Sequence, residues 1–408
     1  MPEEPALAGL VRSGDQQTRA DDIASGIFGI RDISNAYLVT TSDGDVMVNT
    51  GFMDNAARNH ALLAPHRTGP LRTIVLTQSH ADHFGGVETF REETSRILAG
   101  AGFSANWADM KRLQPFFGPR TRKLWGSVLK RGASPAMPPD VEPDLEIDGL
   151  HRFELGARTF EILPTPEGET TDGITVWLPV ERIAFVGNLF GPAWMSMPFL
   201  NTLRGDKPRS VRQFLASADR VRRLEPEVLV TGHGEPICGA GRIRRDLDTL
   251  IAAVTFIRDG TLDGMNAGCS VEELMQTVKL PDALAIGELH GKVTWAVKAI
   301  WHEYAGWFMY RSTTELYGVP RSAIDADIIE LAGGAERLVD RAERHLEAGD
   351  PLRAIHLLDI VLGSGPGGAR ALKANRLAHQ MLAERAGGEN LSETMWLRAQ
   401  IADADRQL

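Results

Sequence analysis

Three potential metal ligands stand within four residues of one another in the segment TQSHADHFGG, residues 77–86. They are His80, Asp82 and His83, two imidazoles and a carboxylate, and zinc sites in proteins use both kinds of group. A single histidine is more often a packing or surface residue, but three such groups together indicate a metal site. The preceding residues 73–76 are apolar and largely β-branched, which predicts a buried strand with the ligands on the loop at its carboxyl end. Ligands placed in this way suit an open, catalytic metal site.

Short apolar segments separated by glycine-rich turns continue to about residue 235 and predict an α/β fold for this part of the chain. The clearest predicted strands are AYLVTT, DVMVN, RTIVLT, FEILPT, ITVWLP, RIAFVG and EVLVTG. Residues 103–140 show little regular periodicity and are expected to form a long loop. That loop is either a wall beside a substrate or a surface excursion with its own apolar cluster.

Beyond about residue 265, periodic apolar residues and strong helix formers predict an all-α region. Residues 335–386 contain three amphipathic segments, separated by Gly-Asp-Pro and Gly-Pro-Gly-Gly, at a spacing near that of a tetratricopeptide-like hairpin. A single unit of this kind cannot bury its apolar face alone. We therefore expect it to pack on the α/β part or on another subunit.

The length of 408 residues predicts two or three domains, and the 43% hydrophobic content is enough for sizeable cores. A net charge of -10 argues against nucleic acid as a partner. Only two cysteines are present, so no disulfide framework is expected. The polar, acidic amino terminus lacks the features of a signal peptide and no stretch has the apolar length of a membrane span, which favours a cytoplasmic location.

The segment 77–86 resembles the H-x-H-x-D-H signature of the metallo-β-lactamase superfamily, and the resemblance covers roughly residues 25–260. It implies an αββα sandwich whose further ligands come from later strand ends. Glu169 stands where the superfamily usually has its third histidine, Asn188 where it has a bridging aspartate, and His233 at the final histidine.

Three positions depart from that pattern: Gln78 replaces the first histidine, Asn49 in VNTG replaces an aspartate, and Asn188 replaces the bridging aspartate. Amides are uncharged and bind zinc poorly compared with imidazole or carboxylate. The expected ligands are His80, Asp82, His83, Glu169, His233, Gln78 and Asn188, with one Zn²⁺ held firmly by Asp82, His83 and His233. His80, Glu169 and Gln78 are expected to hold a second, weaker ion or to orient the water. Iron and manganese also suit such mixed ligands, and a site without metal is the alternative.

The helical part is similar to the dimerisation domain of type III alkyl sulfatases, in which a glutamate also replaces the third histidine. NTLRGD, residues 201–206, is similar to the sulfatases' N-x-x-T-L-R-G segment, whose arginine holds the sulfate. The resemblance implies that Arg204 contacts the sulfate, with Thr202 and Asn201 as helpers, and a guanidinium is well suited to an oxyanion. The sterol-carrier-like domain of those sulfatases is not found before Leu408, so long-chain detergent sulfates are not expected as substrates.

We therefore predict an amino-terminal arm (1–24), a metallo-β-lactamase-like catalytic domain (25–260) and a helical dimerisation domain (265–408). The predicted function is a homodimeric, metal-dependent hydrolase of a small anionic ester, preferably a sulfate ester, with catalytic roles for Asp82, His80 and Glu169. The apolar segment 191–200 is expected either to bind a hydrophobic tail or to pack in the core.

Two alternatives remain open from the sequence. One is a hydrolase of the same fold that acts on a lactone, carboxyl ester, thioester or phosphoester and does not need Arg204. The other is a degenerate, non-catalytic dimeric binding or scaffold protein, which the amides at Gln78, Asn188 and Asn49 suggest.

Overall fold

The computed structural model describes residues 5–129, 137–138, 140–365 and 368–408. The chain divides into two compact units. The larger unit comprises Ala6–Arg122 and Gly126–Tyr304, and the smaller comprises Met1–Pro5, Lys123–Trp125 and Ala305–Leu408. These units do not follow the expected division near residues 260–265, because apolar residues of the helix after residue 292 pack into the core of the larger unit.

The first sheet of the larger unit has seven strands in sequence order. They are β1 (Asp21–Ala24), β2 (Ile27–Ile30), β3 (Ala36–Thr41), β4 (Gly44–Val48), β5 (Leu71–Leu76), β6 (Arg96–Gly100) and β7 (Leu145–Ile147). Strands β1 to β4 pair antiparallel, whereas β4 to β7 run parallel. The expected amino-terminal arm thus contains the edge strand of this sheet and a short helix, α1 (Ala6–Val11).

The second sheet has six strands in the order β13-β12-β11-β10-β9-β8. They are β8 (His151–Leu155), β9 (Arg158–Pro164), β10 (Ile174–Leu178), β11 (Ile183–Gly187), β12 (Val228–Thr231) and β13 (Ile237–Cys238). Strands β11 and β12 pair in parallel and the other pairs are antiparallel.

Alternate residues of the two sheets make the central core. Val46 and Val48 of β4 share one buried cluster with Ile174 and Val176 of β10. Met47, between the two valines, belongs to a different cluster on the outer face of the first sheet. This period-two alternation is what a strand with both faces covered requires.

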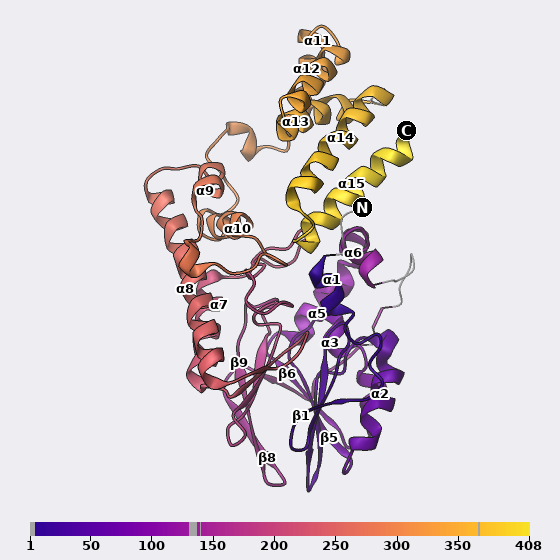
Figure 1. Cartoon of the computed structure of the whole chain (residues 1–408), viewed down its shortest axis with the longest axis vertical. Helices are drawn as coiled ribbons and strands as arrows, with labels where there is room; N and C mark the ends of the chain where they lie inside the picture. Colours follow the sequence, from indigo (N-terminus) through magenta and orange to yellow (C-terminus); the bar gives the residue numbers. More distant parts are fainter. Residues whose placement is uncertain (1–4, 130–136, 139, 366–367) are drawn as a thin grey trace. The chain divides into compact units, whose positions relative to one another are not determined.

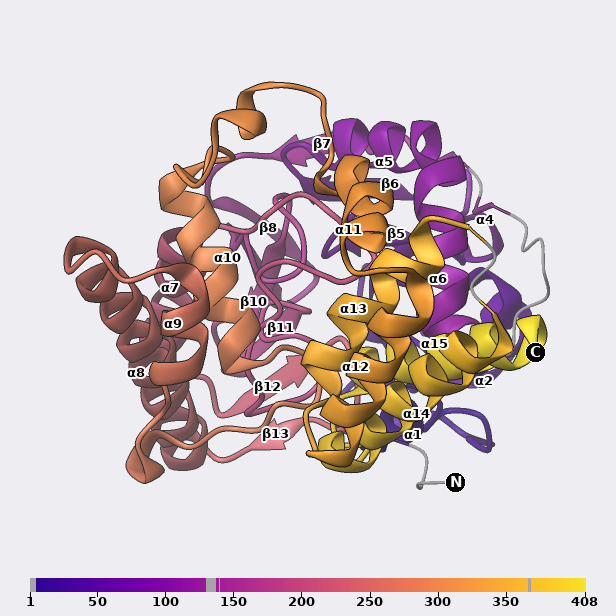
Figure 2. The same cartoon turned by 90° about the horizontal axis from the view of Figure 1, so that it is seen from above.

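Helices cover both outer faces of the sheets (Figures 1 and 2). On the first sheet lie α2 (Ala56–Leu63), α3 (Ala81–Phe84), α4 (Val87–Phe90) and α5 (Phe103–Arg112), and on the second lie α7 (Val211–Leu224), α8 (Ala240–Asn266), α9 (Val271–Thr277) and α10 (Val293–Ala305). The predicted αββα sandwich is confirmed.

The expected long loop at residues 103–140 is wrong over its first part, which forms α5 and α6 (Gln114–Leu129). Helix α6 could not be predicted from the sequence pattern, because it contains Gly118 and Pro119, two residues of low helix propensity. Phe103 and Trp107 of α5 are buried against Phe84, so packing overrides the weak local signal. Residues 130–136 and 139 lie outside the described residues.

The smaller unit is helical throughout its described elements, as predicted. It contains α11 (Asp325–Leu331), α12 (Ala335–Glu347), α13 (Pro351–Gly363), α14 (Ala369–Ala386) and α15 (Leu391–Gln407). The three predicted amphipathic helices are α12, α13 and α14, which share one apolar core. Asp350 caps α13 by accepting a hydrogen bond from the Arg353 amide, with Pro351 in the first turn. Residues 366–367, in the Gly-Pro-Gly-Gly segment between α13 and α14, lie outside the described residues.

Across the described parts of the chain, no helix combines the length and apolar character needed to cross a bilayer.

Candidate metal and substrate site

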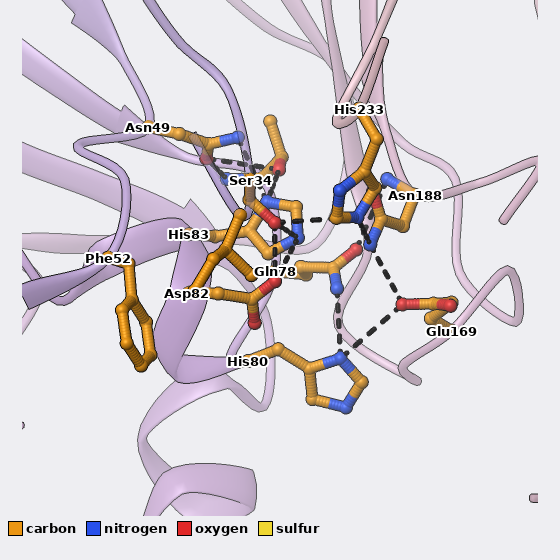
Figure 3. A network of polar contacts seen from close by, with 12 residues as sticks. Ser34, Asn49, Phe52, Gln78, His80, Asp82, His83, Glu169, Asn188 and His233 are labelled. Carbon is orange, nitrogen blue, oxygen red and sulfur yellow. Dashed lines mark hydrogen bonds and ion pairs between the residues drawn. The ribbon is translucent and has the colours of Figure 1, made fainter. Parts of the chain in front are cut away.

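The carboxyl ends of strands from both sheets meet at the candidate site. Asp82 and His83 lie on α3, just after β5 of the first sheet, and His233 follows β12 of the second. One ligand atom from each of these three residues lies within 4.8 Å of the other two. His83 and His233 are buried, and Figure 3 shows the three side chains turned toward one another. A carboxylate and two imidazoles at this separation fit a zinc ion.

The Ser34 hydroxyl lies among all three of these ligands. Its oxygen makes a short hydrogen bond to Asp82 Oδ2, and it lies 3.0 Å from His83 Nε2 and 3.5 Å from His233 Nε2. Ser34 precedes β3 and is fully buried. The sequence reasoning missed it, because a serine in a loop carries no local signal for a metal site.

Asn49 holds His83 from the opposite side of the ring. Its Nδ2 lies 3.0 Å from His83 Nδ1, while its Oδ1 accepts hydrogen bonds from Thr77 N (2.9 Å) and Thr77 Oγ1 (3.0 Å). Asn49 has a φ of 60°, a left-handed conformation that asparagine tolerates better than most residues. The side chain is therefore fixed between the end of β4 and the ring.

A second polar group adjoins the first. His80 Nδ1 lies 3.1 Å from Gln78 Nε2 and 3.6 Å from Glu169 Oε2. Asn188 Nδ2 joins the two groups, because it lies 2.8 Å from Glu169 Oε2 and 2.9 Å from His233 Nε2 (Figure 3). The structure thus gathers all seven predicted ligands in one place.

Arg204 and Asp206 lie on the far side of the His80 ring. His80 Nε2 is 3.3 Å from Arg204 Nη2 and 3.4 Å from Asp206 Oδ2. Arg204 also lies 3.6 Å from Asp206 Oδ2. Asn201 is exposed and Thr202 is half-buried, and the Gly205 amide donates to the Thr202 carbonyl, which closes the turn that carries Arg204.

His290 adds an imidazole that the sequence reasoning missed, since it lies beyond the expected catalytic domain. Its Nε2 is 3.2 Å from Glu169 Oε1, on the carboxylate oxygen opposite to the one that faces His80. The ring is buried edge-on against Phe199. Glu169 therefore lies between two imidazoles.

Burial and charge set the protonation of these rings differently. Burial lowers the pKa of His83 to about 4 despite the nearby Asp82 carboxylate, and it also lowers the pKa of His233. Burial opposes a charge on His80 as well, but hydrogen bonds to Asp206 and Glu169 outweigh it and raise the pKa of His80 to about 9. At neutral pH the metal-free protein thus has neutral imidazoles in the first group and a protonated one in the second. Metal ligation by histidine requires the neutral ring, which favours the first group.

A glycine leaves the room that this arrangement needs. A Cβ on Gly232 would lie 2.0 Å from Asn188 Oδ1 and 3.0 Å from His83 Cε1. A side chain at the residue before His233 would therefore displace the Asn188 amide from its present position and crowd the His83 ring.

A pocket opens beside His80 and Glu169. Its apolar wall is formed by Met110 and Leu113 of the α5 region and by Phe117 of α6, and its polar lining includes Lys207. Part of the segment 103–140 thus forms a wall beside the site, but this part consists of helices α5 and α6 and not of the expected loop.

The apolar segment 191–200 packs largely in the core and leaves little side chain for a ligand. Met197, Phe199 and Leu200 are each at most 3% exposed, and Trp194 donates a hydrogen bond to Asp246.

The chain belongs to the metallo-beta-lactamase superfamily, whose family pattern it matches over residues 29–233. It also matches the alkyl sulfatase dimerisation family over residues 270–398. Both predicted resemblances are thereby confirmed.

Two curated relatives illustrate the similarity. A linear primary-alkylsulfatase of Pseudomonas sp. is 28% identical over 331 residues, which are 74% of this chain and 61% of the relative. An alkyl/aryl-sulfatase of Saccharomyces cerevisiae is 25% identical over 359 residues, 80% of this chain and 55% of the relative. The chain therefore spans less than two thirds of the length of these relatives.

Among solved structures, the fold is similar to that of Pisa1, a stereoselective inverting sec-alkylsulfatase from Pseudomonas sp. The TM-score is 0.83 at 21% identity, over 95% of this chain and 65% of that chain. This likeness extends over both units and supports the fold assignment.

Proposed function

We propose that the protein is a metal-dependent hydrolase that acts on a small anionic ester, preferably a sulfate ester. The observation that carries the proposal is the convergence of Asp82, His83 and His233 within 4.8 Å, next to a second polar group in which Arg204 contacts His80. The alkylsulfatase relatives make sulfate esters the first class to test.

In this proposal Asp82, His83 and His233 hold one zinc ion, and Gln78, His80, Glu169 and Asn188 form a second, weaker half-site. Zinc supplies Lewis-acid chemistry and makes a water molecule more acidic. Glu169 and His80 orient the attacking water, since Asn188 connects Glu169 to His233 of the first group and His80 lies beside Glu169.

Arg204 binds the sulfate group. Its guanidinium offers planar donors and a permanent charge to an oxyanion. That charge is needed because Asp82, Glu169 and Asp206 would otherwise repel an anionic substrate. Thr202 and Asn201, in the same turn, assist Arg204. The pocket wall of Met110, Leu113 and Phe117 receives the organic part of the ester.

The helical region that matches the alkyl sulfatase dimerisation family joins two copies of the chain in a homodimer.

The test measures hydrolysis of sulfate, carboxyl and phosphate esters by the wild type, Arg204→Ala and Asp82→Ala, with Arg212→Ala, an exposed arginine on α7, as the control. We expect Asp82→Ala to abolish all activity and Arg204→Ala to reduce kcat/KM for sulfate esters at least tenfold more than for carboxyl esters. Equal losses for both substrates would favour another ester class. A wild type that binds no metal and hydrolyses none of these esters would favour a binding or scaffold protein.

A further inference from the structure

Each ligand atom of the first group already has a hydrogen-bonding partner on a neighbouring polar side chain. Ser34 Oγ contacts Asp82 Oδ2 and lies 3.0 Å from His83 Nε2. Asn188 Nδ2 lies 2.9 Å from His233 Nε2. These contacts have a direction, because each hydrogen bond needs one donor and one acceptor.

The orientation of the Asn49 amide is fixed by its neighbour. The backbone N–H of Thr77 can only donate, so the atom of Asn49 that it contacts at 2.9 Å must be the oxygen. The Thr77 hydroxyl donates to the same oxygen at 3.0 Å. The Asn49 NH₂ group is thereby directed at His83 Nδ1, 3.0 Å away.

This amide determines which nitrogen of His83 carries the proton. A proton on Nδ1 would face the amide hydrogen of Asn49 at 3.0 Å and would have only the more distant Thr77 hydroxyl oxygen, at 3.4 Å, as an acceptor, so we assign Nδ1 as the acceptor of the nearer Asn49 amide. The ring proton then resides on Nε2, from which it is donated to Ser34 Oγ at 3.0 Å. The Ser34 hydroxyl in turn donates to Asp82 Oδ2. A directed chain of hydrogen bonds therefore runs from Asn49 to Asp82.

We infer that Asn49 sets the tautomer of His83 and thereby weakens metal binding by Asp82, His83 and His233. This inference rests on the proposed function, in which these residues hold the metal. A metal ion at Nε2 requires the ring proton to move to Nδ1, where it meets the Asn49 amide hydrogen. Rotation of that amide would remove this conflict, but it would turn the NH₂ group toward the Thr77 N–H, lose the hydrogen bond from that amide and place two donors against each other.

A carboxylate at position 49 removes the conflict. It has no hydrogen and accepts from all three donors present: the Thr77 amide, the Thr77 hydroxyl and a proton on His83 Nδ1. A carboxylate that accepts from a ligating histidine orients the ring and increases its basicity, and loss of such a partner typically costs about 10- to 100-fold in metal affinity. Asn49→Asp is therefore expected to raise zinc affinity by about the same factor.

The matched control is Asn35→Asp, which introduces the same charge at another buried asparagine. Asn35 Nδ2 donates to the Tyr37 hydroxyl and the Gly234 carbonyl rather than to a candidate ligand. Asn35 and Asn49 are 2% and 1% exposed, so the two substitutions are similarly buried. If zinc affinity rises in Asn49→Asp but not in Asn35→Asp, the rise comes from the tautomer of His83 and not from the general attraction of a new negative charge.

Two measurements test the inference. The first is nitrogen-15 NMR of the histidine rings in the metal-free wild type, with the His83 signals identified by their loss in His83→Gln. The second is the zinc affinity of the wild type, Asn49→Asp and Asn35→Asp, determined by competition with a chromogenic chelator. We expect His83 to be protonated on Nε2, and only Asn49→Asp to bind zinc about 10- to 100-fold more tightly.

A proton on Nδ1 in the metal-free wild type would overturn the inference, and this result is accessible even if Asn49→Asp does not fold. An unchanged affinity in Asn49→Asp, or an equal rise in Asn35→Asp, would overturn it as well. Neither measurement depends on hydrolysis. A protein that shows the expected tautomer and affinities but cleaves no ester would contradict the proposed function alone.

Discussion

Asp206 Oδ2 lies 3.4 Å from Nε2 of His80, on the side of the ring opposite to the nitrogen that faces Gln78 and Glu169. When the His80 ring is neutral, a carboxylate in this position accepts the Nε2 proton, and the Nδ1 lone pair then faces the second half-site. Such outer partners orient ligating histidines and tune their basicity.

We expect Asp206→Ala to lower kcat/KM for the hydrolysed ester by about 10- to 100-fold, because the His80 ring loses the acceptor that fixes its tautomer. Asp206→Asn keeps a neutral acceptor and is expected to lose less. Steady-state kinetics of both variants, with exposed Asp43→Ala as the control, would check this. Equal losses in Asp206→Ala and Asp43→Ala would contradict the positioning role.

Metal content distinguishes the two half-sites. The wild type is expected to hold about one zinc per chain, since the first group has three strong ligands whereas the second relies on the Gln78 amide. Asp82→Ala should lose this zinc, and Gln78→His should raise the content toward two. Elemental mass spectrometry of protein purified without chelator measures both effects. His151→Ala, on β8, serves as the control, and a Gln78→His variant that gains no metal would argue against a second half-site at His80 and Glu169.

The Asp32 carboxylate supports the loop that carries Ser34. It accepts hydrogen bonds from the Phe52 amide (2.8 Å), the Ile33 amide (2.7 Å) and the side chains of Asn55 and Asn59. Asp32→Asn places an NH₂ group against two of these donors, so we expect it to lower the free energy of unfolding by about 1–3 kcal/mol. Urea denaturation, compared with exposed Asp22→Asn, measures the effect. A variant as stable as wild type would show that the loop does not depend on this carboxylate.

Glu92 contributes a pH dependence to stability. Burial raises its pKa, but hydrogen bonds from Arg67 and the Leu71 amide together outweigh burial and lower the pKa below its ordinary value of 4.5. Because the pKa is lower in the folded protein than in the unfolded chain, the stabilisation is complete above pH 4.5 and is lost as the pH falls through the folded-state pKa.

Glu92→Gln should therefore be less stable than the wild type at pH 7, and the difference should shrink below pH 4.5. Denaturant unfolding at several pH values tests this, with Glu93→Gln as the neighbouring control. A difference that is constant with pH would assign the effect to packing rather than to charge.

The sequence predicted those parts of the fold whose signal is local. Strands β3, β4, β5, β10 and β11 are buried on both faces over most of their length and read as apolar, β-branched runs. Strands β1 and β8 were not predicted, because they are short and alternate only between half-buried and exposed residues. Helix α6 was missed because Gly118 and Pro119 give it a low helix propensity, although Leu124 and Val128 on the helix are buried.

The residues of the candidate site also fall into those that the sequence predicted and those that it did not. His80, Asp82 and His83 were found because they are adjacent in sequence, and Glu169, Asn188 and His233 because they match a family pattern. Ser34 and His290 reach the site only through the topology of the sandwich and its helices. Asp206 lies two residues after Arg204, within the predicted segment 201–206. It was not predicted as a site residue, because no spacing rule indicates that it contacts His80.

The ligands of the first group are contributed by two different sheets. Backbone hydrogen bonds from Ile174 to Thr77 (3.0 Å) and from Asn35 to Gly232 (2.6 Å) join the same strand ends. A cation held by Asp82, His83 and His233 would thus cross-link the two halves of the sandwich and would bind only after they have docked. If the proposed zinc site forms, zinc binding would depend on folding: chelation should lower the melting temperature, and metal uptake during refolding should report when the two sheets meet.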